Sequence, residues 1–390
     1  MIERLRPVIE RFRRAPRPLV IAGGAVLVVA IVAATLLVVT TPGGTAQATP
    51  IAIASQMTAS PSPLSSSSPE ASPSPTAAGP ATPVPTDWVA SDLDGVLASK
   101  DLAHRLPIAI MIDDNIIARP QSGFSSASIV YQAPADGGED RYMLVFQEGT
   151  AKDIGPVRSA RPYYVYWVDE YKAVFGHYGG DVKSLQQVIP ANTKNIYNMD
   201  ALNGGSCPYH RIDTRVGPHN AYTNSADLIS CTAKLGYPAT FQNMPVRPFR
   251  EDVALDQRPA SQTITIPYRT GTIGYTFDPA TDSYNRLVDG KLQIDPANKE
   301  QVKARNVIVM FQSLTTDPQS EPGYNRPVVA NEGTGKAVVF QEGKAIEGTW
   351  KKTSDTALTR FYDSSGKEIS LVRGQIYMQS VPVGTALTYK

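Results

Sequence analysis

Residues 106–115 read Leu-Pro-Ile-Ala-Ile-Met-Ile-Asp-Asp-Asn, an apolar run that ends abruptly in acidic and amide side chains. The run 106–112 has the length and composition of a buried strand. Two further strand candidates follow at 128–132 and 141–146, with the turn signal Gly137-Gly138 between them. These segments predict the beginning of a sheet.

Helix candidates alternate with strands across residues 88–245. The pattern predicts helices at 158–171, 181–189 and 224–235 and a strand at 173–178. Pro162 suits the first turn of the first helix, with Ser159 as its cap, because that turn leaves the backbone amides unpaired in any case. Alternating strands and helices indicate an α/β-type domain over 88–245.

The helix signal disappears beyond about Phe249. Short β-branched or aromatic runs follow, separated by turns such as Asp289-Gly290 and Ser365-Gly366. Many short strands with close turns predict a mostly β domain over 246–390, built as a sandwich or a partly open barrel. The predicted fold class is therefore α+β. The expected strands are 263–266, 273–277, 307–311, 337–340, 359–362, 368–372 and 376–381.

The first 87 residues predict a membrane anchor and a linker. Residues 1–18 carry six arginines and two glutamates, and residues 19–39 carry no charge. A helix over 19–39 would be about 31 Å long, which matches a hydrocarbon core of about 30 Å. Residues 40–87 are rich in Pro, Ser and Thr, which predicts a disordered linker that holds the folded part away from the membrane.

The charges on either side of the apolar segment predict its orientation. No Lys or Arg follows it until Lys100, so the positive-inside rule makes 1–18 a basic cytoplasmic tail. We expect a single-pass signal-anchor in the plasma membrane, with both domains extracytoplasmic. The alternative is a cleaved signal peptide with Ala46-Gln47-Ala48 as its cleavage site, although a cleavable apolar region is usually only about 7–15 residues long. No cysteine near the segment could carry a lipid.

The charge balance argues against a nucleic-acid partner. The chain has 37 Lys and Arg against 36 Asp and Glu, and without the tail the balance is 31 to 34. Binding to phosphate backbones requires a basic surplus, which this balance lacks. The glycine patterns of serine hydrolases and nucleotide enzymes are also absent, and no metal-binding spacing of His or Cys occurs. We therefore expect neither a metal nor another cofactor.

Polar clusters of the first domain form the candidate ligand site. In Gly155-Pro156-Val157-Arg158-Ser159-Ala160-Arg161-Pro162, two guanidinium groups flank a predicted helix start. Arginine there opposes the helix dipole and needs an anionic partner, such as a carboxylate, phosphate or pyrophosphate. The alternative partner is internal, because Asp113, Asp136 or Asp181 could pair with these arginines as a structural network. The expected ligand-binding residues are Arg119, Arg141, Arg158, Ser159, Arg161, His177, Gly179, Gly180, Arg211, His219 and Asn220.

The histidines and cysteines support separate expectations. His177 and His219 lie beside glycine or proline turns, where a histidine serves either as an acid–base group or as a hydrogen-bonded structural residue. The pattern assigns no catalytic residue. Cys207 and Cys231 are expected to form a disulfide in an oxidising compartment.

Motifs from both domains resemble the YerB-like lipoprotein family, whose paired N- and C-terminal domains have no established reaction. The resemblance covers roughly residues 100–385 and implies an envelope-facing, membrane-tethered protein. Two features depart from the family pattern: the anchor lacks a lipidated cysteine, and Asp136 and Asp140 lie beside the glycines. The matching runs are 108–113, 118–123, 129–133, 137–141, 154–162, 177–180 and 218–223, then 306–309, 348–352 and 374–375.

Two classes of function remain open. The first is a binding protein of the cell envelope. Its Arg and His side chains would hold an anionic or polar ligand, such as a cell-wall component, and its β domain would contact the wall or a protein whose identity the sequence does not reveal. The alternative is an envelope phosphotransferase acting on pyrophosphate-linked lipids. The chain also resembles the LytR–CpsA–Psr enzymes in its membrane helix, its arginines after a strand and its Tyr178-Gly179-Gly180 turn. In that resemblance Arg158 and Arg161 would stabilise a pyrophosphate leaving group.

Overall fold

The computed structural model describes residues 85–203, 207–241 and 243–390. The basic tail, the signal-anchor and the linker up to residue 84 lie outside the described residues. The described residues form one compact unit. Across the parts of the chain that the structure describes, no helix is long and apolar enough to cross a membrane.

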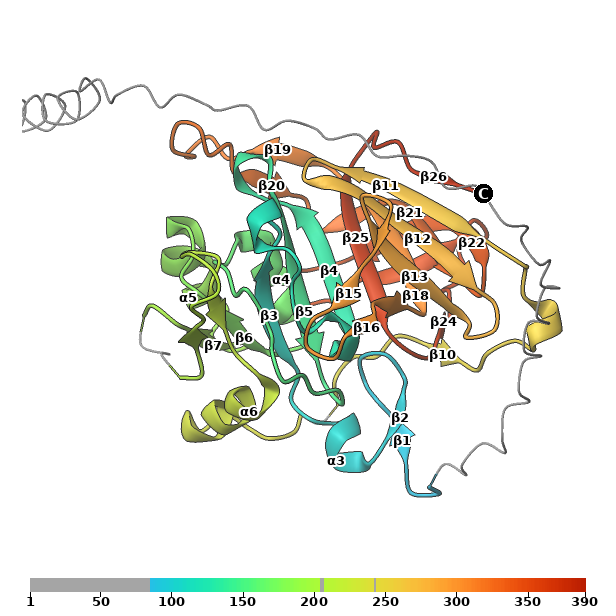
Figure 1. The fold of residues 1–390 in the computed structure, drawn as a ribbon, viewed down its shortest axis with the longest axis horizontal. Helices are drawn as coiled ribbons and strands as arrows, with labels where there is room; N and C mark the ends of the chain where they lie inside the picture. Colours follow the sequence, from blue (N-terminus) through green and yellow to red (C-terminus); the bar gives the residue numbers. More distant parts are fainter. Residues whose placement is uncertain (1–84, 204–206, 242) are drawn as a thin grey trace, which may run out of the picture. The chain divides into compact units, whose positions relative to one another are not determined.

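A ten-stranded mixed sheet forms the centre of this unit (Figure 1). β25 lies in the middle and runs parallel to both of its neighbours, β18 and β4. The C-terminal half of the chain therefore contributes strands to the same sheet as the N-terminal half. In their order across the sheet the strands are β23 (Arg360–Asp363), β22 (Lys344–Lys352), β21 (Gly333–Gln341), β18 (Asn306–Gln312), β25 (Ile376–Pro382), β4 (Ile129–Pro134), β5 (Asp140–Phe146), β3 (Ile108–Asp113), β6 (Val174–His177) and β7 (Tyr197–Asp200).

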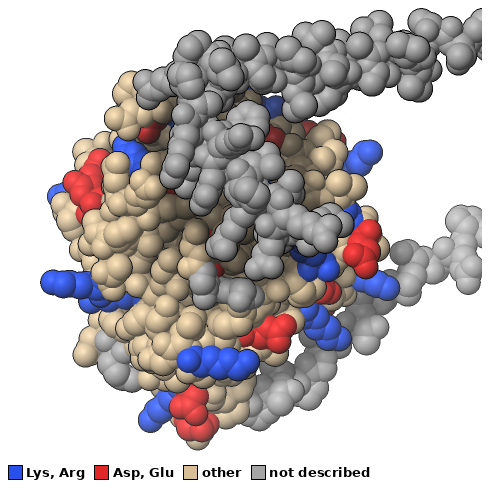
Figure 2. Space-filling model, turned by 90° about the vertical axis from the view of Figure 1, so that its left-hand side faces the viewer, with Lys and Arg blue, Asp and Glu red and all other residues tan. Residues whose placement is uncertain are grey.

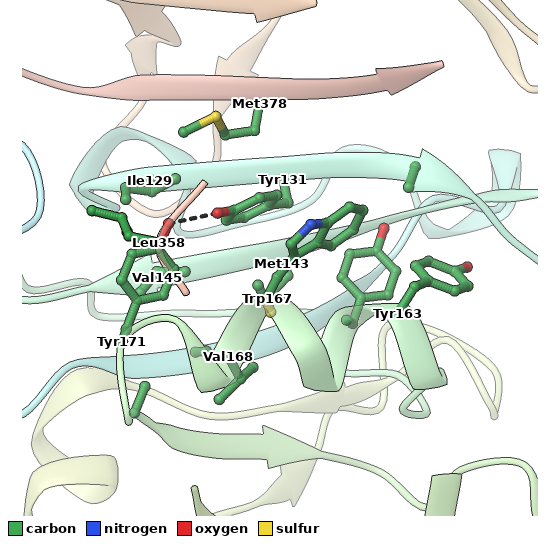
Figure 3. Close-up of a cluster of buried hydrophobic side chains, with 14 of the residues drawn as sticks. Ile129, Tyr131, Met143, Val145, Tyr163, Trp167, Val168, Tyr171, Leu358 and Met378 are labelled. Atoms are coloured by element: carbon green, nitrogen blue, oxygen red, sulfur yellow. Dashed lines mark hydrogen bonds between the residues drawn. The ribbon is translucent and has the colours of Figure 1, made fainter. Parts of the chain in front are cut away.

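Helix α4 (Pro162–Asp169) covers one face of this sheet (Figure 3). The aromatic ring of Tyr131 on β4 stacks on Trp167 at 4.9 Å between ring centres. Its hydroxyl also lies 2.5 Å from the hydroxyl of Tyr171, which follows the helix. Trp167 and both tyrosines are almost completely buried, so the aromatic run that begins after Pro162 is a core face rather than an interface.

A second, antiparallel sheet covers the opposite face and forms a second core. Ile264, Ile273 and Tyr275 from this sheet pack in one cluster with Val307 and Tyr377 from the large sheet. Side chains on each strand alternate between the two cores because successive residues of a strand point to opposite faces. The strands of the second sheet are β14 (Lys291–Leu292), β13 (Ser283–Val288), β12 (Gly271–Asp278), β11 (Thr263–Tyr268) and β26 (Thr388–Tyr389), with β17 (Lys303–Ala304) paired to β13.

Short elements complete the unit around the two sheets. Helix α6 (Ser225–Lys234) packs Leu228 and Cys231 into the second core. A π-helical turn (Ser184–Val188) leads directly into α5 (Ile189–Ala191). The remaining elements are β1 (Val89–Ala90) with β2 (Leu97–Ala98), α3 (Lys100–Ala103), β8 (His210–Arg211) with β9 (Ala221–Tyr222), β10 (Phe249–Arg250) with β24 (Leu371–Val372), β15 (Ile294–Asp295) with β16 (Glu300–Gln301), and β19 (Leu314–Thr316) with β20 (Pro327–Val329).

The α+β class is confirmed, while the predicted helix at 158–171 is wrong at its start. The helix begins at Pro162, and Arg161 before it has the extended dihedral angles φ −136° and ψ 150°. A residue that precedes proline is driven out of the helical region by the proline ring. Val157 and Ala160 form bridges to Ile112 and Gly180 instead. Ser159 is consequently not a helix cap.

The C-terminal strands do not close a sandwich of their own. Five of them (β18, β21, β22, β23 and β25) extend the large sheet, and six others (β11, β12, β13, β14, β17 and β26) form the second sheet that packs on it. Figure 1 shows β11, β12 and β13 crossing the C-terminal part of the large sheet. The segments 88–245 and 246–390 are therefore joined by one continuous hydrogen-bonded sheet.

Candidate functional site

The candidate site lies where β3 and β4 end and β5 begins. The sheet register places Asp113 opposite Arg141 on the adjacent strand. The segment 155–161 runs across this edge because the amide of Asp113 donates to the Pro156 carbonyl at 2.9 Å, and the amide of Arg158 donates to Met111 at 2.9 Å. In sheets of this kind, the carboxyl ends of parallel strands are a common place for ligands to bind.

A polar cavity of about 590 Å³ opens at this edge. Four of the expected ligand-binding residues line it: Arg141, Arg158, Ser159 and Arg161. A loop from the C-terminal half completes the wall through Pro322, Gly323 and Tyr324, and the amide of Gly137 donates to the Tyr324 carbonyl at 2.6 Å. Asp136, Gly137 and Glu139, from the turn between β4 and β5, form the remaining side.

Arg161 is satisfied internally. Its guanidinium group forms two parallel hydrogen bonds to the Asp136 carboxylate, with Nε 2.7 Å from Oδ1. Burial alone would raise the pKa of Asp136, but the hydrogen bonds and charge of Arg161 lower it below its ordinary value. Arg161 also donates to the Ser159 hydroxyl at 3.0 Å. Arg161 therefore has an internal carboxylate partner, which is the alternative to a ligand that the sequence analysis left open.

Arg141 has a different environment. It is only 3% exposed, and it forms no ion pair with any carboxylate among the described residues. One terminal nitrogen donates to the carbonyl and hydroxyl oxygens of Ser159 at 3.0 and 3.1 Å, whereas Nε has no hydrogen-bond partner. Burial, together with the positive charge of Arg161, lowers the pKa of Arg141 to about 10. A buried cation without a counter-ion is costly.

Arg158 presents its guanidinium group to the same cavity. Its Nε lies 3.0 Å from Oδ2 of Asp113. The same carboxylate oxygen lies 2.6 Å from Nδ1 of His219. Neither terminal nitrogen of Arg158 forms a hydrogen bond within the described residues. Asp113 therefore positions Arg158 and His219 together while leaving the far end of the arginine free to bind.

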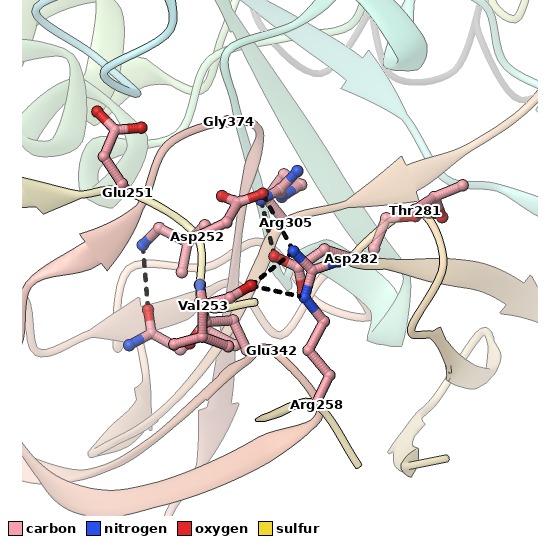
Figure 4. A network of polar contacts seen from close by, with 12 residues as sticks. Glu251, Asp252, Val253, Arg258, Thr281, Asp282, Arg305, Glu342 and Gly374 are labelled. Carbon is pink, nitrogen blue, oxygen red and sulfur yellow. Dashed lines mark hydrogen bonds and ion pairs between the residues drawn. The ribbon is translucent and has the colours of Figure 1, made fainter. Parts of the chain in front are cut away.

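Another arginine cluster of the same chain provides a contrast (Figure 4). Arg305 pairs with Asp252 and with Asp282, the latter at 2.8 Å, and Arg258 lies 3.6 Å from Asp252 and 3.9 Å from Asp282. Each guanidinium group there faces carboxylates of the chain itself. That network joins the segment around 252–258 to the second sheet, and we assign it a structural role.

Comparison with known proteins identifies the family. The N-terminal domain of the protein of unknown function DUF3048 matches residues 93–238, and its C-terminal domain matches residues 264–378. "Putative lipoprotein YerB" of Bacillus subtilis (strain 168) is 27% identical over 308 residues, which are 77% of this chain and 89% of that protein. The chain belongs to the YerB-like family.

A solved structure supports the same assignment. The crystal structure of YerB from Bacillus subtilis superposes with a TM-score of 0.68 at 25% sequence identity, covering 77% of this chain and 99% of that chain. The relative's name describes a lipoprotein, whereas the apolar segment of this YerB-like chain has no cysteine beside it. The family resemblance inferred from the motifs is confirmed.

Other expected site residues of this YerB-like chain lie outside the cavity. His177 is fully buried, and its ring nitrogens lie 2.7 Å from the Gly179 carbonyl and 2.7 Å from Oδ1 of Asn198. Both nitrogens are therefore occupied by structural contacts. The Gly179 carbonyl also accepts the Ala160 amide at 2.9 Å, and Gly180 bridges to Ala160. This glycine turn supports the arginine segment from behind.

Two further arginines occupy separate positions. Arg119 lies 3.0 Å from Asp114 and 3.6 Å from Asp289, at the contact with the second sheet. Arg211 is exposed and donates to Asn220 and to the Tyr178 hydroxyl. The expected set thus separates into the arginine cavity, an Asp114 cluster and an exposed Arg211 cluster.

Sequence reasoning missed the cavity residues supplied by the loop between β19 and β20. Pro322, Gly323 and Tyr324 follow the arginine segment by about 160 residues, and the only local signal is a Pro-Gly turn. The turn residue Glu139 was also missed as a lining residue; its carboxylate accepts a hydrogen bond from the side-chain amide of Asn115. No sequence spacing connects these segments.

The remaining expectations concern the cysteines and metals. Cys207 and Cys231 are joined by a disulfide with Cα atoms 5.9 Å apart, which ties the loop before β8 to α6. Within the described ranges, no three His, Cys, Asp or Glu side chains are placed to hold a metal ion. On the face shown in Figure 2, basic and acidic side chains are interspersed over the visible surface.

Proposed function

We propose that this chain is a membrane-tethered, extracytoplasmic protein of the cell envelope that binds an anionic ligand in the arginine cavity. The observation that carries the proposal is Arg141, a buried guanidinium group that faces the cavity without an ion-pair partner among the described residues. An anion between Arg141 and Arg158 would supply the missing negative charge.

The geometry favours a group with several oxygen acceptors. Arg141 has an unpartnered Nε, and Arg158 has two terminal nitrogens without hydrogen bonds to described residues. Planar guanidinium groups bind carboxylates and phosphates through paired hydrogen bonds. The volume of about 590 Å³ exceeds what a single phosphate ion needs and leaves room for an attached polar group.

The membrane tether and its orientation rest on the sequence. Residues 19–39 have the length of a membrane span, and the arginines of the tail precede them. The name of the Bacillus subtilis relative, which describes a lipoprotein, favours the same side of the membrane for the folded part. A cell-wall or lipid component with a phosphate or carboxylate group is the ligand class that fits this location.

The test is calorimetric titration of residues 80–390 with pyrophosphate and with inorganic phosphate. Arg158→Ala should weaken binding by about ten- to a hundredfold, because a charge-assisted hydrogen bond contributes about 1.5–3 kcal/mol. Arg360→Ala is the matched control, since Arg360, on the far edge strand β23, pairs with Glu368. Equal affinity of wild type and Arg158→Ala, with both melting alike, would refute the site. Steady release of phosphate from pyrophosphate would instead favour the phosphotransferase.

A further inference from the structure

Large apolar side chains are exposed on loops that connect to the arginine segment. They stand on separate loops at one edge of the large sheet: after β3, after β6, after β7 and between β8 and β9. Their exposed fractions range from 58 to 83%. Isolated exposed apolar residues are normal, but these stand on loops that are linked, directly or through one further loop, to Asp113 or to the arginine segment. We call this set the apolar rim: Ile116, Ile117, Val182, Leu202 and Val216.

Hydrogen bonds connect the first part of the rim to the cavity. The amide of Asn115 donates to Oδ1 of Asp113 at 3.0 Å, and Ile116 and Ile117 follow directly. Arg215 donates to the Ala118 and Pro120 carbonyls, the latter at 2.7 Å, so the loops that carry Ile117 and Val216 are joined. These loops are therefore fixed in position relative to the arginines.

The other two rim residues are placed by the loops behind the cavity. Val182 follows Asp181, whose carboxylate lies 3.9 Å from Arg161. The amides of Leu202 and Gly179 both donate to Oδ1 of Asp200 at 2.9 Å. Gly179 in turn supports Ala160 in the arginine segment. The rim thus extends along the edge on both sides of the segment.

The combination of a cationic cavity and an exposed apolar rim matches the surface of a lipid bilayer. Phosphate groups lie at the headgroup level, and the apolar faces of proteins that bind the interface are buried about 5–10 Å into the boundary between headgroups and acyl chains. We propose that this edge docks on a membrane, with the phosphate of an anionic lipid headgroup in the arginine cavity and the apolar rim in the interface. This inference rests on the proposed function, because it identifies the anion of the arginine cavity as the phosphate of a lipid headgroup.

The expected tether permits this contact. Residues 41–87 would span at most on the order of 145 Å when fully extended, and bends between the Pro-rich stretches allow shorter separations. A folded unit on such a linker stays within reach of the membrane in which it is anchored. Tethering raises its effective concentration at that surface, so even weak headgroup binding is sufficient.

The experiment uses residues 80–390, which contain both cores and correspond to nearly the whole crystallised YerB chain. Co-sedimentation is measured with vesicles of phosphatidylcholine alone and of phosphatidylcholine with phosphatidylglycerol, and pyrophosphate affinity is measured in parallel. The rim variant is Ile116→Ser/Ile117→Ser. The control is Leu255→Ser/Leu292→Ser, which removes two apolar side chains of similar exposure on other elements.

We expect wild type and the control to bind the anionic vesicles, and the rim variant to bind them about tenfold more weakly with unchanged pyrophosphate affinity. Arg158→Ala should weaken both vesicle binding and pyrophosphate binding by about ten- to a hundredfold. Equal vesicle binding by the rim variant, or equal binding to neutral vesicles, overturns the docking inference. If the wild-type protein binds pyrophosphate but not vesicles, the docking inference is overturned and the anion site stands. If it binds neither, the proposed function is overturned as well.

Discussion

Arg141 and Arg161 line the same cavity but differ in what surrounds their charge. Arg161 faces the carboxylate of Asp136 in a two-bond pair, while Arg141 has only the oxygens of Ser159. An ion pair in the interior is costly to break from one side, because the remaining charge is left uncompensated. Arg141, which the charge of Asp136 influences without a hydrogen bond or ion pair, carries part of that cost already.

Replacement of each arginine by methionine should therefore have opposite effects on stability. Arg161→Met leaves Asp136 buried with less positive charge around it, and we expect the free energy of unfolding to fall by about 3–5 kcal/mol. Arg141→Met should leave it unchanged or raise it while abolishing anion binding. Urea unfolding followed by circular dichroism measures both. A loss of stability in Arg141→Met as large as that in Arg161→Met would show that Arg141 is a structural residue.

Asp140 is a second buried charge with an unusual environment. Burial raises its pKa to about 7, and the nearby charge of Asp114 adds to the effect. Its carboxylate accepts hydrogen bonds from the amide and hydroxyl of Thr270, in the turn between β11 and β12. The titrating group therefore lies at the contact between the second sheet and the large sheet.

We expect this carboxyl to make folding stability depend on pH. A carboxyl whose pKa is raised by folding holds its proton more tightly in the folded state, so stability increases as the pH falls from about 7 towards 4. Asp140→Asn should reduce this dependence, to which the raised pKa of Asp169 also contributes, and should be more stable than wild type at pH 8 by on the order of 1–3 kcal/mol. Thermal melts of both proteins between pH 4 and 8 measure the difference. Parallel pH profiles for the two proteins would contradict this assignment.

At the scale of elements, the sequence predicts most strands because buried strands are continuous apolar runs. β3, β4, β5, β18 and β25 all lie at or within two residues of the expected positions. β22 was missed because Lys344–Lys352 combines charged residues and a glycine with few apolar ones. It is a strand because it pairs with both β21 and β23, which are contacts that local composition does not encode.

The site was only partly predictable for a related reason. The motif around Arg158 identifies an anion-binding segment, because arginines beside turns need negative partners. The sheet register places Asp136 and Asp113, and their positions decide which arginine has an internal partner. The local sequence does not predict that register. The wall formed by Tyr324 comes from the other half of the chain. The sequence therefore identifies the charged residues of the site. Which of them pair with one another is determined by the fold.

For the whole molecule, the shared sheet makes the two halves interdependent. Met378 on β25 is fully buried and lies between β18, from the C-terminal half, and β4, from the N-terminal half. A defect at this strand should therefore weaken the hydrogen-bonded layer on both sides.

We expect Met378→Ala to lower the unfolding free energy by about 2–5 kcal/mol through cavity formation. Hydrogen exchange read by mass spectrometry should show β5 and β21 losing protection by the same amount. Val383→Ala, an exposed site one residue beyond the strand, is the control. Loss of protection in β21 with β5 unaffected would mean that the halves unfold independently.

The central position of β25 also sets the order of events during biosynthesis. Translation proceeds from the N-terminus, so β4 emerges some 250 residues before the strand that will pair with it. Until then β4 has an open edge, which is the kind of surface that other chains can join. The N-terminal half therefore cannot complete its part of the large sheet before the C-terminal half has been synthesised. A chain that stops before Ile376 is left with two separate parts of the large sheet, because the strand that joins them is made after every other strand of that sheet.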